Sequence, residues 1–173
     1  PATLSAFAFN TLMGMAGGII GAWVKTRDPF WMMSGALIGI FAAASGLDVY
    51  YPPVAFVLGT FGGFVVPMVA VQLEKMGIDD AVGAFPVHGI GGLIGVVSCG
   101  IFAAGYPNVD GMPPVSLWGQ IVGAVTMAVL GFVPGYVVSY ILKVFGLLRV
   151  PDNIQEKGLD IVKVPVSAYP ENY

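Results

Sequence analysis

The sequence predicts an all-α membrane protein with five transmembrane helices. Hydrophobic residues make up 57% of its 173 residues and charged residues only 10%, whereas an average soluble domain carries about 25% charged residues. So few charges could not cover a surface that faces water. The charges are also unevenly spaced, and they leave five long runs with no charged side chain, each close to or above the roughly 20 apolar residues of a membrane helix.

These charge-free runs define the expected helices in order. They cover residues 1–24, 29–47, 49–73, 81–109 and 111–142. Turn-forming residues such as Asp28-Pro29 and Tyr51-Pro52-Pro53 lie between them. We therefore expect helices near residues 4–24, 30–47, 53–73, 83–104 and 115–142. A closed β-barrel would instead show short segments of alternating hydrophobicity.

Basic residues set the expected orientation of these helices. In the five-helix arrangement all of them fall on one side of the membrane: Lys25, Arg27, Lys75, Lys143, Arg149, Lys157 and Lys163. The positive-inside rule places that side in the cytoplasm. We therefore expect a multi-pass protein of the cell membrane, embedded in the lipid bilayer, with its N-terminus outside and its C-terminus inside.

The chain divides by composition into a membrane segment and a tail. Residues 1–142 hold the five expected helices, and residues 143–173 form a mixed polar tail on the cytoplasmic side. About thirty residues are too few for a core of their own. The tail could be disordered, dock under the bundle or recruit a soluble partner. The net charge of −3 argues against a nucleic-acid partner.

His88 is the single histidine of the chain and lies inside the charge-free run 81–109. Its surroundings are Pro86-Val87-His88-Gly89-Ile90-Gly91-Gly92. An ionisable group in a membrane segment is costly unless it lines a polar path, and the glycines leave space beside it. A structural histidine that is satisfied by neighbouring groups is the alternative. Within a bilayer we favour a functional role.

Other chemistry has little support in the sequence. Cys99 is the lone cysteine and lies in an apolar run, which excludes an internal disulfide and a cysteine metal cluster. No Gly-x-Ser-Gly nucleophile motif accompanies His88, and no His/Glu/Asp cluster has the spacing of metal ligands. We expect neither an enzyme nor a bound cofactor or metal.

Several motifs together resemble the ammonium transporter (Amt/Rh) family. Asp79-Asp80, followed by Phe85-Pro86-Val87-His88-Gly89-Ile90-Gly91-Gly92, is similar to the second conserved histidine helix of that family. The similarity continues at other points, in order along essentially the whole chain: Asn10-Thr11, Asp28-Pro29-Phe30-Trp31-Met32-Met33-Ser34-Gly35-Ala36, Leu148-Arg149-Val150-Pro151 and Glu156-Lys157-Gly158-Leu159-Asp160.

The resemblance implies the architecture of a half-transporter. Family members usually have eleven membrane helices, built from two inverted five-helix repeats with one pore histidine each, and assemble as trimers. This chain resembles the last five helices and the tail. An ammonium/ammonia channel would then need an N-terminal half, supplied by a partner chain. A non-transporting membrane scaffold subunit of a larger complex is the alternative.

The resemblance also implies roles for single residues. His88 would be one of the paired pore histidines, whose imidazoles accept and donate a proton near neutral pH. Ala84, Phe85 and Val87 lie within one turn of it and are possible pore neighbours, or packing residues. Asp79 and Asp80 would lie at the cytoplasmic mouth, where carboxylates also favour a helix N-terminus. There they could attract cations or contact the tail.

The sequence departs from the family pattern at two places. A threonine often found in the second helix of this half is replaced by Ala44 or Ser45. In the tail, Val164-Pro165-Val166 stands where many bacterial members have His-Gly-Glu. This departure counts against a regulator of the PII type, which stays a possible partner.

Overall fold

The structure is a computed structural model that describes residues 3–107, 111–159 and 162. The tail residues Val164-Pro165-Val166 lie outside the described part. The described elements are α1 (Leu4–Thr26), α2 (Pro29–Ala43), the 3-10 turn η1 (Ala44–Gly46), α3 (Pro52–Lys75), the π-helical turn η2 (Phe85–Ile90), α4 (Gly91–Phe102), α5 (Leu117–Val144) and α6 (Asp152–Lys157).

Five helical segments are long and apolar enough to cross a membrane, as the sequence predicted. They are Leu4–Thr26, Pro29–Gly46, Pro52–Lys75, Phe85–Phe102 and Leu117–Val144. The described part of the chain contains helices and no strand. The predicted fold class, an all-α protein with five candidate membrane helices, is therefore confirmed.

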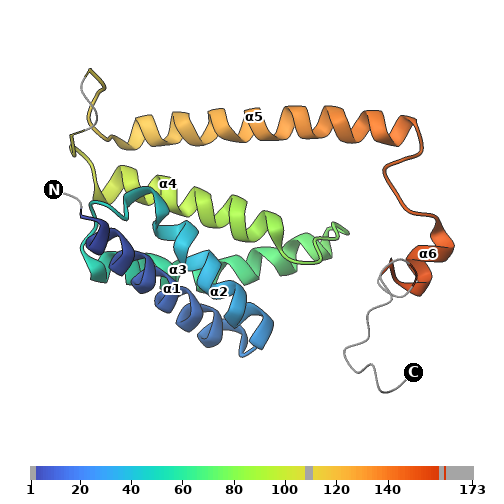
Figure 1. Ribbon diagram of the computed structural model, residues 1–173, viewed down its shortest axis with the longest axis horizontal. Coiled ribbons are helices and arrows are strands. Elements are labelled where there is room, and N and C mark those ends of the chain that lie inside the picture. Colours follow the sequence, from blue (N-terminus) through green and yellow to red (C-terminus); the bar gives the residue numbers. More distant parts are fainter. Residues whose placement is uncertain (1–2, 108–110, 160–161, 163–173) are drawn as a thin grey trace. The chain divides into compact units, whose positions relative to one another are not determined.

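The chain forms two compact units, Pro1–Thr126 and Met127–Tyr173. The first contains α1 to α4, which pack side by side (Figure 1), and the beginning of α5. The second contains the rest of α5 and the short helix α6, which the sequence did not predict. Within α6, the Gln155 side chain donates to the carbonyl of Val150 (2.9 Å) and accepts from Arg149 (3.3 Å), both of which precede the helix.

The helix starts follow local chemistry. Thr3 accepts a hydrogen bond from the amide of Ala6 (3.1 Å) and begins α1. Asp28 does the same for Phe30 (2.9 Å) at the start of α2, where Pro29 is the first helical residue. Such side chains satisfy amides that have no partner inside the helix, and proline at the first position gives up an amide that is unpaired anyway.

Glycines form the contacts between α1, α2 and α3. A Cβ added to Gly14 would lie 2.9 Å from the carbonyl oxygen of Gly39 on α2. A Cβ added to Gly18 would collide with the carbonyl of Gly35, and one added to Gly63 on α3 would collide with that of Gly18. The three backbones therefore touch directly, which is the packing that small residues allow in membrane helices.

A buried asparagine ties α1 to the loop that precedes α3. Asn10 is only 2% exposed, and its Nδ2 donates to the carbonyls of Leu47 (2.8 Å) and Tyr50 (2.7 Å). The ring of Tyr50 lies against Gly46 and belongs to a buried cluster with Leu58, Cys99 and Ala103. Burial, with Cys99 and Asp48 nearby, raises the pKa of the Tyr50 hydroxyl above its usual range, so the group stays neutral.

Every helix differs from its predicted bounds by a few residues, and the second and fourth also change in helix type. The second helix was expected to run to residue 47, but α2 ends at Ala43 and continues only as the 3-10 turn. This early end places the carbonyls of Leu47 and Tyr50 within reach of Asn10. The fourth was expected over 83–104, whereas the structure begins it with the wide turn Phe85–Ile90 and ends it at Phe102.

We predict that Asn10→Ala lowers the free energy of unfolding by about 2 kcal/mol, because two buried carbonyls lose their donor. Thr11→Ala is the matched control, since the Thr11 hydroxyl bonds only the carbonyl of Phe7 in its own helix (2.9 Å). Denaturant titration in detergent micelles measures both. Equal stability of the two variants would contradict the role given to Asn10.

Candidate functional site

The helix that carries His88 begins at a capped N-terminus. The carboxylate of Asp80 accepts hydrogen bonds from the amides of Ala84 (2.7 Å) and Phe85 (2.8 Å). Both oxygens are used, so Asp80 satisfies two amides that have no intrahelical acceptor, and its charge faces the positive end of the helix dipole. Asp79 is exposed. Of the two acids, Asp80 is the one that fixes where this helix starts.

The first turn of this helix is π-helical and separates an inner from an outer face. Pro86 and Val87 are buried, and Val87 packs against Ile38 of α2 and Val66 of α3. His88 is exposed on the other side. π-helical turns are rare and occur frequently at functional sites. Here the turn directs adjacent residues to opposite faces.

In the first unit, the exposed side chain of His88 lies beside an aromatic neighbour. Its ring lies 4.5 Å from that of Phe41 on α2, centroid to centroid, at 60°. Its imidazole makes no hydrogen bond with any of the residues that the structure describes. Its two nitrogens are therefore free of the backbone partners that a structural histidine would have.

The predicted pore neighbours divide between the two faces. Ala84 and Phe85 are exposed like His88, and the Phe85 ring lies over Gly89, 3.3 Å from where a Cβ would stand. Val87 is in the core at 3% exposure. The outer face thus carries Ala84, Phe85 and His88, whereas Val87 packs into the core beneath the turn.

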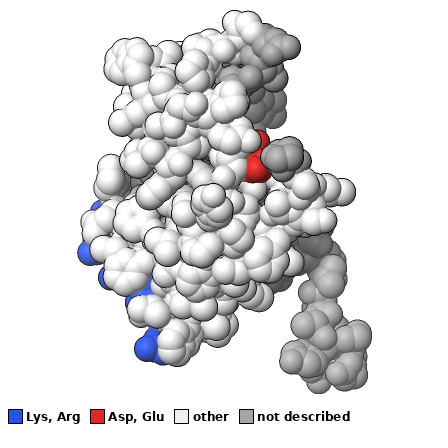
Figure 2. Space-filling view, turned by 90° about the vertical axis from the view of Figure 1, so that its left-hand side faces the viewer, with Lys and Arg blue, Asp and Glu red and all other residues white. Residues whose placement is uncertain are grey.

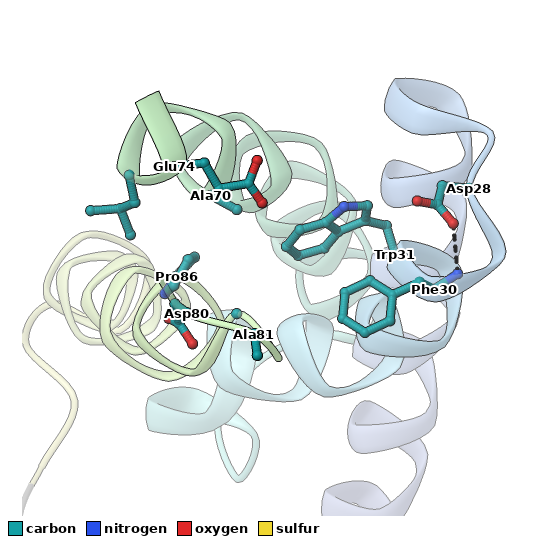
Figure 3. Close-up of a pocket in the computed structure, with 10 residues that line it drawn as sticks. Asp28, Phe30, Trp31, Ala70, Glu74, Asp80, Ala81 and Pro86 are labelled. Atoms are coloured by element: carbon teal, nitrogen blue, oxygen red, sulfur yellow. Dashed lines mark hydrogen bonds between the residues drawn. The ribbon is translucent and has the colours of Figure 1, made fainter. Parts of the chain in front are cut away.

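A cavity of about 230 Å³ opens beside the start of the His88 helix (Figure 3). Three carboxylates and two aromatic rings contribute to its wall, which consists of Asp28, Phe30, Trp31, Ala70, Leu73, Glu74, Asp80, Ala81, Gly83 and Pro86. Asp28 and Asp80 each cap a helix. Two of the three acids therefore have structural partners, and His88 is not part of the wall.

Basic residues lie at the same end of the unit. Lys25 Nζ stands 5.1 Å from the centre of the Phe64 ring, and the Arg27 guanidinium 3.6 Å from that of Trp23. Such cation–π contacts suit a membrane boundary, where long basic side chains reach the headgroups. Figure 2 shows Lys and Arg along one edge of a face that otherwise carries almost no charge.

The opposite end of the unit contains Ala44 and Ser45, one of which was expected to stand in place of a threonine. Ala44 and Ser45 are both exposed in the 3-10 turn. The carbonyl of Ser45 accepts a hydrogen bond from the thiol of Cys99 (3.1 Å), so this buried cysteine joins α4 to the end of α2. No group of three His, Cys, Asp or Glu suited to a metal ion occurs among the described residues.

Sequence reasoning missed Phe41. Phe41 lies far from His88 in the sequence, so the sequence does not show that their rings are in contact. The available signal was the spacing of Gly91 and Gly95, which marks a face of α4 where another helix comes close. That signal does not say which helix, or which of its side chains, occupies the position.

Comparison with known proteins decides the family. The profile of the Ammonium Transporter Family matches residues 2–169. The chain belongs to this family. It is therefore a multi-pass membrane protein of a family of transporters and not of enzymes, as the sequence predicted.

Known ammonium transporters resemble the chain over nearly all of its length. Ammonium transporter Amt2 of Methanocaldococcus jannaschii is 39% identical over 164 residues, which are 94% of this chain and 39% of that protein. Amt1 of the same organism is 36% identical over 97% of this chain and 43% of its own length. The Bacillus subtilis ammonium transporter is 30% identical over 92% and 42%. The chain thus spans about two fifths of these relatives.

We predict that Gly95→Ala destabilises the protein and displaces α4 from α2, because the added Cβ would collide with the carbonyl oxygen of Phe41. Gly92→Ala is the matched control: no atom lies within 4 Å of its added Cβ, and alanine favours a helix by about 1 kcal/mol over glycine. Thermal unfolding should separate the pair, with Gly95→Ala lower and Gly92→Ala equal to or above the parent. The reverse order would contradict the close α2–α4 contact.

Proposed function

We propose that this chain is the C-terminal half of an ammonium/ammonia channel, with His88 as one of two paired pore histidines. The observation that carries the proposal is the exposed imidazole of His88 in an apolar helical segment, with no hydrogen bond from the described residues. An imidazole left against lipid is unfavourable. A second half that covers this face and brings a second imidazole removes that cost.

The chemistry of the substrate supports this role. A bare ammonium ion loses its hydration on entering an apolar passage, at a large energetic cost. Ammonia crosses more readily if the proton leaves it and moves separately between imidazoles, each of which can accept and donate. His88 is the only histidine of the sequence, so the proposed pair needs the N-terminal half. The complete channel would assemble as a trimer, as the family resemblance implies.

We predict that the 173-residue chain alone does not take up methylammonium in liposomes, because the substrate path of transporters built from inverted repeats lies at the repeat interface. Uptake should appear when a matching N-terminal half is co-expressed. His88→Ala in the completed assembly should abolish proton-coupled transport and leave assembly intact. Robust uptake by the isolated chain would overturn the proposal.

The orientation of the chain is the second part of the proposal. In the first unit, Lys25 lies in the last turn of α1, Arg27 caps that helix and Lys75 ends α3. We place this end, the cavity beside Asp80 and residues 143–173 in the cytoplasm of a cell-membrane protein. Under this assignment Asp80 stands at the cytoplasmic mouth. The loop around Asp48 then lies outside.

Cysteine labelling in intact cells tests this orientation. We expect a membrane-impermeant maleimide to label Asp48→Cys but not Lys157→Cys until the cells are opened. Cys99 is buried, which keeps the background low. Labelling of both positions from outside would contradict the arrangement.

The competing function is a membrane scaffold subunit without transport activity. A scaffold would use the helical fold alone and needs no complete pore. If the completed assembly stays inactive and the native protein co-purifies with unrelated membrane subunits, the scaffold replaces the channel half. Mass spectrometry of the native complex identifies these subunits.

A further inference from the structure

The aromatic contact of His88 is held in place from two sides. Phe41 is half-buried and packs with Ile38, Val66 and Val87, the apolar cluster beneath the π-helical turn. Its backbone belongs to α2 and that of His88 to the turn before α4. The Phe41 ring is therefore anchored by the core, while the imidazole it touches is exposed. The Phe41 ring thus limits the rotation of the exposed His88 imidazole.

Glycines of α4 make this contact possible. A Cβ on Gly91 would stand 3.4 Å from the Cβ of Phe41, and one on Gly95 would collide with the Phe41 carbonyl oxygen. With larger residues here α2 would stand farther from α4. The two glycines one turn apart therefore bring Phe41 to the imidazole, at a ring separation of 4.5 Å.

The π-helical turn completes the arrangement. It sends Val87 into the core and leaves His88 exposed, and the Phe85 ring lies next to Gly89. One flank of the imidazole is therefore occupied by Phe41. Its polar nitrogens have no partner among the described residues. An imidazole in this position has one apolar wall and needs its polar partners from elsewhere.

We propose that Phe41 is a positioning residue that holds the imidazole of His88 in the orientation its proton-transfer role requires. This inference rests on the proposed function of His88. An imidazole passes a proton efficiently only when its nitrogens are aligned with the neighbouring donor and acceptor. Phe41 offers no hydrogen bond and so does not compete for these nitrogens. It limits the rotation of the ring and excludes water from one flank.

Nuclear magnetic resonance of the full chain in nanodiscs tests the contact without any transport assay. Because the sequence has one histidine, isotope-labelled histidine reports on His88 alone. Phe41→Leu should move the imidazole signals toward those of free histidine, since the ring current of Phe41 is lost, and Phe41→Tyr should keep them displaced. Phe61→Leu, which removes an exposed ring of α3, is the control and should leave them unchanged.

Transport by the assembly completed with an N-terminal half tests the consequence. We expect Phe41→Leu to lower the maximal rate about tenfold, because small misplacements of reacting groups cost one to two orders of magnitude, while KM stays the same. Phe41→Tyr should restore the rate. If circular dichroism shows that the leucine variant misfolds, Phe41→Met, which also lacks a ring, replaces it in the transport assay.

The outcomes separate this inference from the function on which it rests. Unmoved imidazole signals in Phe41→Leu, or a parental transport rate in Phe41→Leu while His88→Ala is inactive, would overturn the positioning role. Transport that survives His88→Ala would instead overturn the proposed role of His88. A tenfold loss that tyrosine restores, together with displaced signals, supports the positioning role.

Discussion

Direct contact between helix backbones at glycines is the constraint on which the packing of α1 to α4 depends. Lipid tails are as apolar as leucine, so helices in a bilayer gain little from hiding apolar side chains from one another, and close packing has to supply the association. Gly14, Gly18 and Gly63 bring α1, α2 and α3 into backbone contact. The bulky side chains are then free to point outward, which is why large hydrophobic residues such as Phe61 and Leu37 are exposed and suit lipid.

The same constraint determines where polar groups can lie. The tight contacts leave little space inside, and the Asn10 amide is buried there at 2% exposure. Its Nδ2 donates to the carbonyls of Leu47 and Tyr50, in the loop between α2 and α3. Buried carbonyls without donors are costly. One asparagine thus permits the helix α2 to stop early and the chain to turn within the apolar region.

The sequence predicts the helices well because their signal is local. Charge-free length and proline-marked gaps place five segments to within a few residues. The early end of α2 and the π-helical turn at His88 depend on tertiary contacts, with Asn10 in one case and with the Ile38 and Val66 cluster in the other. The length of a charge-free run carries no information about such tertiary contacts.

The candidate site shows the same division between local and distant information. His88 could be singled out because an ionisable residue is rare in such a segment, and Asp80 because an acid before a helix favours its N-terminus. Phe41 is one of eleven phenylalanines, and only the close approach at Gly91 and Gly95 distinguishes it from the others. Residue identity thus singles out His88, for which we propose proton transfer, while packing places the ring of Phe41 beside its imidazole. Gly91 and Gly95, which serve helix packing, therefore also fix the surroundings of the imidazole.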